Sequence, residues 1–308
     1  MADVFEVCGP VRRALGEGRP VVALETAVLT HGLPRPLNLE VFREMEAAVA
    51  EAGAVPAPVG LVAGRLEVGL SPGGVVRLAT GEGVRKAGLA DLAPLAAAGA
   101  DAGTTVGATL RAAQAAGIEV FATGGLGGVH PGAAASFDIS GDLAALSRFG
   151  GCVVCSGPKA VLDVAATYQS LETLGVTVLA YGTWELPAFT CAASGLRARH
   201  RVDRPEEVAR AVRARNALGL PSAVVAAHPP PPEQAVEKEA LQAYLARASE
   251  RLERSGVGGP AVTPFLLQAL AEASGGATLE ANRALLVANA RLAARIAAAL
   301  AGGGAPGP

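Results

Sequence analysis

Lysine is rare in this chain, and two of its lysines follow segments that contain glycine. The sequence has 26 lysines and arginines together, and lysine occurs only at positions 86, 159 and 238. A primary amine can lose its proton when it is desolvated and then attack a carbonyl carbon or a sugar C1, whereas a guanidinium group stays charged. Lys238 lies between two glutamates, which is typical of a solvated helix face. Lys86 and Lys159 are therefore candidates for chemistry, and an exposed or capping cation is the alternative for each.

The stretch 118–159 brings several chemical groups close together. An apolar run at 118–122 predicts a buried strand, and the loop 123–130 after it is rich in glycine. Glycine lets backbone N–H groups approach a ligand closely, and such loops bind anions. Asp138 and Asp142 come next, followed by a second apolar run at 152–155 and by Lys159. We expect the functional site in this stretch.

Asp138 and Asp142 have the spacing of one helical turn. If the segment is helical, both carboxylates lie on one face, where one or two such groups suit a hard cation that keeps several waters. The alternative is that one of them caps a helix. Both interpretations stay open at this point.

A third carboxylate, Glu25, follows the apolar run 21–24, which predicts a buried strand. In α/β proteins ligands bind at the carboxyl ends of the strands, so an acid there is a candidate site residue. Burial would favour its neutral form, which suits a general acid. The alternatives are that Glu25 caps the next segment or pairs with an arginine. His31, in the following loop, faces either the same cleft or solvent.

Three further motifs have weaker interpretations. Thr104 and Thr105 stand in a turn before a predicted helix, where they either cap the helix or hold an anion at its N-terminus. The glycines at 124–128 argue against a dinucleotide loop, because the third glycine is misplaced and no helix follows directly. Cys152 and Cys155 flank two valines, so they resemble strand residues more than a redox or zinc pair.

Strands and helices are predicted to alternate along the chain. The pattern favours a β-hairpin around Gly64, strands at 21–24, 118–122, 152–155, 176–181 and 222–227, and helices at 11–15, 39–52, 161–174, 204–218, 232–252 and 278–300. This order predicts an α/β fold with a largely parallel sheet and helices on both sides. We expect one domain over residues 1–301 and a flexible tail at 302–308.

Composition argues against several classes of function. A net charge of −2, a pI near 6.1 and 4% aromatic residues disfavour a nucleic-acid surface, which needs basic side chains and stacking rings. No run of about eighteen apolar residues lacks both charge and glycine, so we expect no membrane span. The N-terminal residues do not have the pattern of a signal peptide. Small-molecule chemistry in the cytoplasm is the resulting expectation.

These motifs together resemble a known family. Over nearly its full length the chain is similar to the pseudouridine-5′-phosphate glycosidases. The matching motifs, all in the same order, are 23–26 (ALET), 30–34 (THGLP), 104–109 (TTVGAT), 121–130 (FATGGLGGVH), 137–143 (FDISGDL), Lys159, 181–183 (YGT), 262–267 (VTPFLL) and 279–282 (LEAN). So many motifs in one order make the resemblance specific.

The resemblance implies a fold, an assembly and a reaction. The implied fold is a single α/β/α sandwich, the assembly is a homotrimer, and each subunit takes one Mn²⁺ or another divalent cation. The implied reaction is reversible cleavage of the C–C glycosidic bond of pseudouridine 5′-phosphate to uracil and ribose 5-phosphate. By the same matching, Lys159 forms a Schiff-base-type adduct at ribose C1′, and Glu25 is the general acid and base.

The resemblance also implies roles for the other candidates. Asp138 is the implied metal ligand, and Asn282, or Asn289 on the same helix face, reads the amide edge of uracil. The remaining implied substrate contacts are Lys86, Val106, Thr123, His130, Ser140, Gly141 and Asp142, with Thr123 and His130 holding phosphate or ribose hydroxyls.

The chain departs from the family pattern at a few positions. Pro131 stands where a basic residue is common, Trp184 replaces a commoner acid, and His228 replaces an asparagine before proline. These departures bear on phosphate affinity and on the accepted base. Two other classes of function stay open, an N-glycoside-cleaving nucleotide hydrolase and a non-catalytic phosphosugar-binding protein.

Overall fold

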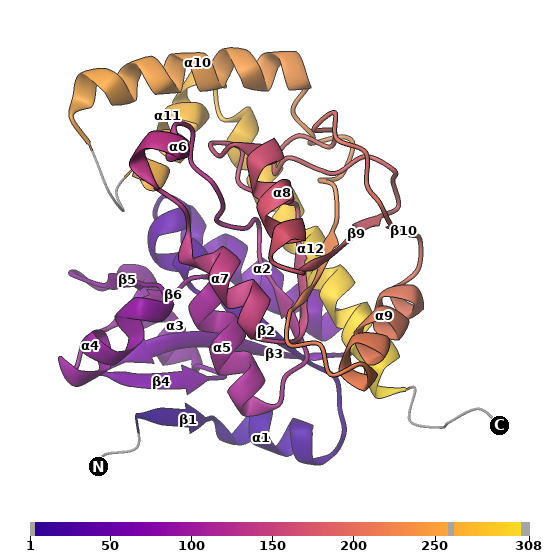
Figure 1. The fold of residues 1–308 in the computed structure, drawn as a ribbon. Helices are drawn as coiled ribbons and strands as arrows, with labels where there is room; N and C mark the ends of the chain where they lie inside the picture. Colours follow the sequence, from indigo (N-terminus) through magenta and orange to yellow (C-terminus); the bar gives the residue numbers. More distant parts are fainter. Residues whose placement is uncertain (1–3, 258–261, 303–308) are drawn as a thin grey trace.

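A mostly parallel sheet runs through the centre of the molecule (Figure 1). The computed structural model describes residues 4–257 and 262–302 of the chain. Its strands are β1 (Phe5–Val7), β2 (Val21–Glu25), β3 (Val55–Val62), β4 (Arg65–Val68), β5 (Arg85–Ala87), β6 (Ala102–Thr104), β7 (Val120–Ala122), β8 (Cys152–Cys155), β9 (Thr177–Tyr181), β10 (Arg201–Val202) and β11 (Val224–Ala227). The strand order is β1-β4-β3-β2-β7-β8-β11-β9-β10, with β6 beside β3 and β5 beside β6. The pairs β3–β4 and β3–β6 are antiparallel.

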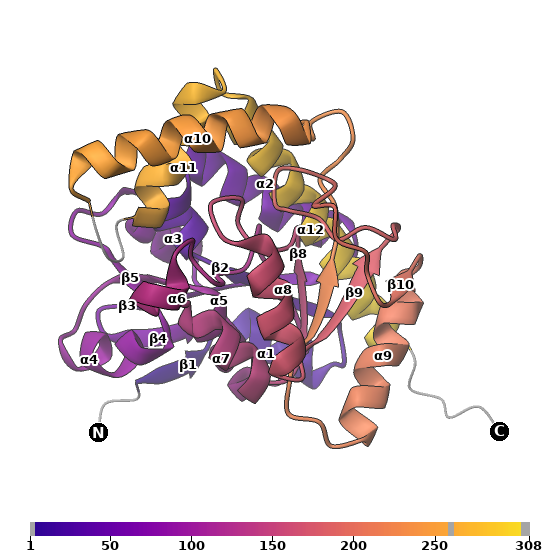
Figure 2. The ribbon, with the colours of Figure 1, turned by 45° about the horizontal axis from the view of Figure 1, so that its top comes forward.

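Helices cover both faces of this sheet (Figures 1 and 2). They are α1 (Gly9–Gly16), α2 (Leu37–Glu51), α3 (Pro72–Thr80), α4 (Leu92–Ala97), α5 (Val106–Ala116), α6 (Ala133–Ser136), α7 (Gly141–Arg148), α8 (Val164–Thr173), α9 (Pro205–Ala217), α10 (Lys238–Ser255), α11 (Val262–Ala273) and α12 (Ala277–Ala301). One buried cluster joins the sheet to α2, α9 and α12, and a second joins it to α1, α5, α7 and α8. The predicted α/β/α sandwich is confirmed.

The apolar strands are buried on both sides because their side chains alternate between the two clusters. In β2, Val22 and Leu24 belong to the first cluster, whereas Val21 and Ala23 belong to the second. The two cysteines of β8 are likewise split between opposite faces of the sheet. Both thiols are free, and burial raises the pKa of each to about 12. This geometry fits strand packing and gives no redox or zinc pair.

The connections place a crevice beside β2. The chain passes from β2 to β3 and β4 on one side of it and later adds β7 and β8 on the other side. In such open sheets, ligands bind outside the carboxyl ends of the strands where the winding reverses. The fold therefore directs attention to the ends of β2 and β7.

Helix α12 packs against the strands that end at this crevice. Among the described residues it is the one helix long and apolar enough to cross a membrane, and half of its most apolar window is buried in the protein. It packs against α2, α9 and the strands β2, β7 and β8. These contacts make it a core helix of the sandwich.

Several elements differ from the sequence-based expectation. Residues 85–87 form β5, where no strand was predicted, because Lys86 pairs alongside β6. Helix α10 begins at Lys238 rather than near 232, since the prolines at 229–232 lead into a turn first. Helix α11 was not predicted. Of the expected tail 302–308, all but Gly302 lies outside the described residues, so that prediction stays untested.

Candidate active site

Three neighbouring strands end at one point, and each supplies a candidate side chain. Glu25 is the last residue of β2, Thr123 directly follows β7, and Lys159 comes shortly after β8. Because β2, β7 and β8 are adjacent and parallel, their carboxyl ends lie at the same edge of the sheet. The Thr123 hydroxyl donates a hydrogen bond to Glu25 Oε1 at 2.5 Å. The backbone N–H of Lys159 donates to the carbonyl of Leu126 at 3.1 Å, which ties its segment to the glycine loop.

Glu25 is only 4% exposed. Burial raises the pKa of its carboxyl above the ordinary value, while the positive charge of Lys159 and the hydrogen bond from Thr123 offset part of that rise. The neutral form is therefore favoured, as a general acid requires. Glu25 makes no ion pair with an arginine among the described residues, and no side chain caps the helical turn at 28–32 that follows β2, so neither alternative is supported.

Lys86 and Lys159 approach Glu25 from different elements. Burial lowers the pKa of Lys86, and the charge of Lys159 lowers it further, whereas Asp142 and Glu25 act in the opposite direction. A small inner cavity of about 50 Å³ is lined by both lysines and by Glu25, together with Ala27, Val28, His31, Gly32, Gly124, Gly125, Phe189, Leu267, Asn282 and Leu286. Burial and the charge of Lys86 also lower the pKa of His31, which favours a neutral imidazole.

The two asparagines of α12 have different roles. The side-chain amide of Asn289 is fully buried and donates to the Thr123 carbonyl at 2.9 Å and to Ser156 Oγ at 3.1 Å. Its oxygen lies 3.0 Å from His228 Nδ1. Asn282 lines the inner cavity, and no hydrogen bond joins its side chain to another described residue. Of the two, Asn282 is the residue with groups free to meet a ligand.

Asp142, in the first turn of α7, links the start of α5 to the glycine loop. Its Oδ1 accepts the Gly107 N–H at 2.9 Å, and its Oδ2 accepts the Gly127 N–H at 3.0 Å. A side chain at position 127 would collide with Ser140 and Asp142, which explains the glycine there. The glycine loop therefore uses the Gly127 N–H to bind Asp142, and that N–H group is not available to a ligand.

The other predicted contacts lie around Asp142. Val106 is the first residue of α5, and Ser140 is the N-cap of α7, where its hydroxyl accepts the Asp142 N–H at 3.2 Å. Gly141 is the first residue of α7. The N-termini of two helices thus meet beside the glycine loop, and helix N-termini favour anions.

Asp138 precedes α7, so the condition under which both carboxylates would share a helix face is not met. Phe137 has a left-handed backbone conformation (φ 55°), and α7 starts only at Gly141. The Asp138 side chain is 53% exposed, and His130 Nδ1 lies 4.0 Å from its carboxylate. Among the described residues no three His, Cys, Asp or Glu side chains gather as a metal site. One exposed carboxylate beside an imidazole fits a divalent ion that keeps several waters.

The model of the family described as indigoidine synthase A like protein matches residues 10–299. A pseudouridine-5′-phosphate glycosidase of Paracoccus denitrificans is 48% identical over 303 residues, covering 98% of this chain and 100% of that protein. One from Streptomyces griseus is 50% identical over 292 residues, covering 94% and 90%. The chain belongs to the pseudouridine-5′-phosphate glycosidase family.

Two solved structures share the fold of this glycosidase family member. The prealnumycin C-glycosynthase AlnA, solved in complex with ribulose 5-phosphate, has a TM-score of 0.90 and 37% identity over 98% of both chains. An indigoidine synthase A-like protein from Thermotoga maritima has a TM-score of 0.88 and 36% identity over 97% of both chains. The predicted family resemblance is confirmed.

The three residues that depart from the glycosidase family pattern differ in burial and in their distance from the site. Pro131 and Trp184 are exposed. The guanidinium carbon of Arg197 lies 5.5 Å from the centre of the Trp184 ring. His228 is mostly buried and bonds to Asn289, so it is the departure closest to the site. Sequence reasoning missed Phe189, which lines the inner cavity with a left-handed backbone (φ 61°). Its position in a loop after proline gave no signal of this role.

Proposed function

We propose that the protein cleaves the C–C glycosidic bond of pseudouridine 5′-phosphate reversibly, giving uracil and ribose 5-phosphate. The observation that carries this proposal is the single cavity in which Glu25, Lys86 and Lys159 meet. The names of the curated relatives support the substrate. The neighbour solved with ribulose 5-phosphate supports a five-carbon sugar phosphate as ligand.

Substrate binding follows from the groups that the site leaves available. The phosphate group binds at the helix N-termini formed by Val106, Ser140 and Gly141, where backbone N–H groups and the helix dipoles favour an anion. Lys86 adds positive charge between this junction and Glu25. Asn282 faces the base, because its amide carries both a donor and an acceptor, as the amide edge of uracil does.

Breaking a bond to carbon requires an electron sink at C1′. In the proposed sequence the C1′–O4′ bond breaks, O4′ gains a proton and the base loses its N1 proton, which leaves a double bond between C1′ and C5 of the base. The Lys159 amine then adds to C1′ with loss of a proton, and N1 is protonated again. Once C5 is protonated, the lone pair of the lysine nitrogen forms an imine while the electrons of the C1′–C5 bond restore the C5–C6 double bond. Water then hydrolyses the imine and releases ribose 5-phosphate.

Glu25 supplies the proton to C5 in this scheme. Burial raises the pKa of this carboxyl and so favours its protonated form, and Thr123 holds the carboxyl in place. In the synthetic direction the carboxylate takes the same proton back. One residue therefore acts as acid in one direction and as base in the other.

Asp138, with His130 beside it, would hold the divalent ion, for which Mn²⁺ is our proposal. Such an ion would neutralise part of the charge of the phosphate group. We also propose a homotrimer in the cytoplasm, on the strength of the family resemblance stated above.

Replacing Lys159 with arginine tests the covalent step. Arginine keeps the charge and cannot form an imine, so Lys159→Arg is expected to lose turnover while its thermal unfolding stays unchanged. Borohydride treatment with ribose 5-phosphate should add the mass of the reduced sugar phosphate to the wild type and not to the variant. Lys238→Arg, on the exposed start of α10, is the matched control and should behave as the wild type. An active Lys159→Arg variant would refute covalent catalysis.

The two rival functions are separated by substrate. An N-glycoside hydrolase would release uracil from uridine 5′-phosphate, whereas the proposed enzyme should release it only from pseudouridine 5′-phosphate. A phosphosugar-binding protein would bind ribose 5-phosphate without turnover and without a trapped adduct. Chromatography of free uracil from the two nucleotides in parallel decides among the three.

A further inference from the structure

His228 is a buried titratable residue that the proposed reaction does not use. It directly follows β11, and its backbone N–H donates to the Cys155 carbonyl at 2.8 Å. The ring of Tyr181 meets its imidazole edge to face, with 5.5 Å between the ring centres. Among the described residues that line the inner cavity, His228 does not occur. Any effect of His228 on the reaction must therefore pass through another residue.

The hydrogen bonds of Asn289 fix the orientation of its amide. The amide nitrogen donates to the Thr123 carbonyl at 2.9 Å and to Ser156 Oγ at 3.1 Å. A carbonyl oxygen can only accept, so the opposite orientation would place two acceptors against each other. The amide oxygen therefore faces His228 Nδ1, which lies 3.0 Å away. Because this oxygen cannot donate, the proton of the neutral imidazole is on Nδ1.

These bonds lead from His228 to the proposed acid. Thr123 is fully buried and is held at three points. Its N–H donates to the Val154 carbonyl at 3.0 Å, its carbonyl accepts from Asn289, and its hydroxyl donates to Glu25 Oε1 at 2.5 Å. Asn289 thus holds the backbone of the residue whose side chain holds the acid. Without the bond from His228, the amide would be free to turn and would hold Thr123 less firmly.

We infer that His228 is a positioning residue: by fixing the Asn289 amide, it holds Thr123 where its hydroxyl reaches Glu25, and so it affects how readily the acid gives up its proton. This inference rests on the proposed function, because it concerns the same acid. It also gives a role to one of the positions at which this chain departs from the family pattern, where asparagine is common.

The charges near Glu25 act on it by a separate route. Burial raises the pKa of Glu25, the charges of Lys159 and Lys86 lower it, and the charge of Asp142 raises it. Each of these three charges acts directly on the carboxyl. None of them takes part in the hydrogen bonds that join His228 to Glu25 among the described residues.

His228 itself brings no charge to the site at neutral pH. Burial lowers the pKa of His228, which outweighs the opposite effect of its bond to Asn289 and favours the neutral imidazole. Tyr181, the titratable residue that packs against it, has a pKa raised by burial and is neutral as well. A change in the pKa of Glu25 after replacement of His228 would therefore report the hydrogen bonds and not a lost charge.

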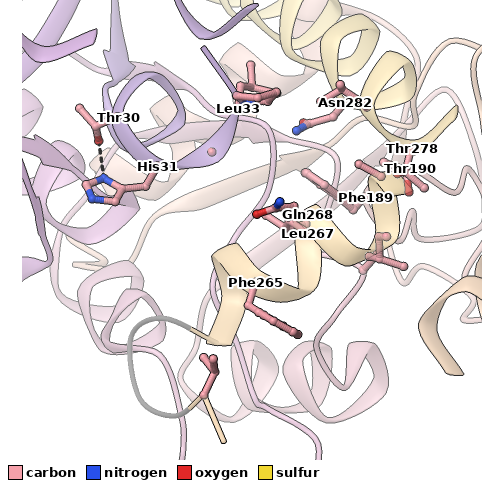
Figure 3. A pocket seen from close by; sticks show the side chains of 17 residues that line it. Thr30, His31, Leu33, Phe189, Thr190, Phe265, Leu267, Gln268, Thr278 and Asn282 are labelled. Atoms are coloured by element: carbon pink, nitrogen blue, oxygen red, sulfur yellow. Dashed lines mark hydrogen bonds between the residues drawn. The ribbon is translucent and has the colours of Figure 1, made fainter. Parts of the chain in front are cut away.

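Asn282 provides an internal reference for this inference. It lies on α12 about two turns before Asn289. Figure 3 shows it at the wall of a second cavity of about 560 Å³, which adjoins the inner cavity there. Between the two asparagines, Leu285 and Leu286 are buried and pack α12 against the sheet. The helix should therefore stay in place without His228, and binding of uracil at Asn282 should change little.

Asparagine and glutamine at position 228 distinguish the two ring nitrogens. In asparagine the amide nitrogen is attached to Cγ, as Nδ1 is in histidine, whereas in glutamine it is one atom further along, as Nε2 is in histidine. His228→Asn should therefore keep the donor for Asn289. His228→Leu removes this donor, and His228→Gln displaces it.

The pH dependence of kcat/KM for pseudouridine 5′-phosphate, measured on the complete protein with Mn²⁺, tests the inference. In His228→Leu the descending limb should move to higher pH by about half a unit, because the bond from Thr123 is weakened and not removed. At pH 7, kcat should fall by about threefold to tenfold, since a displaced acid transfers its proton less well. The KM for uracil in the synthetic direction should stay within about twofold of the wild type, because α12 stays in place.

The other variants supply the comparison. His228→Asn should keep the wild-type limb, and His228→Gln should follow His228→Leu, which also serves if the leucine variant does not fold. A purely structural role would lower the melting temperature of His228→Leu without moving the limb. An unmoved limb in both the leucine and glutamine variants, or an equal shift in His228→Asn, would overturn the inference and leave the proposed function standing.

The protonated carboxyl of Glu25 can also be followed without turnover. Its infrared absorption is isolated by subtracting the spectrum of the matching Glu25→Gln protein, and its loss with rising pH gives the pKa. This pKa should be higher in His228→Leu than in the wild type and in His228→Asn. If the wild type cleaves no pseudouridine 5′-phosphate, the proposed function is wrong, and this titration decides on the role of His228 alone: equal pKa values in all three proteins would exclude it.

Discussion

We predict that the hydrogen bond from Thr123 to Glu25 lowers the pH at which activity declines, because it offsets part of the pKa rise that burial causes. Thr123→Val keeps the volume of the side chain and removes the donor that lies 2.5 Å from Glu25 Oε1. A hydrogen bond to a charged group contributes roughly 1.5–3 kcal/mol, and one pKa unit corresponds to about 1.36 kcal/mol. Burial already raises the pKa of Glu25, and the substitution should raise it by about one to two further units.

The pH dependence of kcat/KM for pseudouridine 5′-phosphate measures this change. A general acid must be protonated, so activity falls as the pH rises through the pKa of Glu25. In Thr123→Val this descending limb should move to higher pH by about the same one to two units. Thr123→Ser keeps the donor and should leave the limb in place. An unmoved limb in the valine variant, or an equal shift in the serine variant, would refute this account of the Glu25 pKa.

Three further predictions concern other parts of the site. Glu25→Gln should lower turnover by roughly 10²–10⁴-fold. Because the pKa of Glu25 is raised in the folded state, the ionised carboxylate opposes folding at pH values above its pKa in the unfolded chain. The Glu25→Gln variant should therefore melt at a higher temperature than the wild type near pH 8, and this gain should disappear near pH 4. Asn289→Leu leaves several buried groups without partners and should lower the free energy of unfolding by about 3 kcal/mol in denaturant titrations. Asn282→Leu, in contrast, should raise the KM for uracil with little loss of stability. Asp138→Ala should abolish stimulation by added Mn²⁺ and leave the melting temperature unchanged, since the side chain is 53% exposed; retained stimulation would remove Asp138 as the ligand.

Much of the fold could be predicted because the strands are short apolar runs buried on both faces. That pattern needs no knowledge of distant contacts, and it fixed β2, β7 and β8. Glu25 stood out as an acid at the end of such a run, and Lys159 stood out because lysine is scarce. Both were found from their own surroundings in the chain.

The remaining features depend on contacts between distant residues. Strand β5 has three residues and exists through its pairing with β6, so its sequence gives little sign of it. Asn289 differs from Asn282 in its surroundings because of Thr123, more than a hundred and fifty positions earlier, whose carbonyl accepts a hydrogen bond from the Asn289 amide. The different surroundings of Asp138 and Asp142 arise because the backbone turns at Phe137 before α7 begins.

The position of α12 in the chain has a consequence for biosynthesis. At a translation rate of about 5–20 residues per second, roughly 7 to 30 s separate the end of β8 from the end of α12. Until the ribosome has made this helix, the sheet surface that carries Leu24, Ala122 and Val154 lacks the cover provided by Leu285 and Leu286. The nascent chain therefore exposes an apolar surface throughout that interval, and a chaperone that binds unfolded chains would bind at this surface.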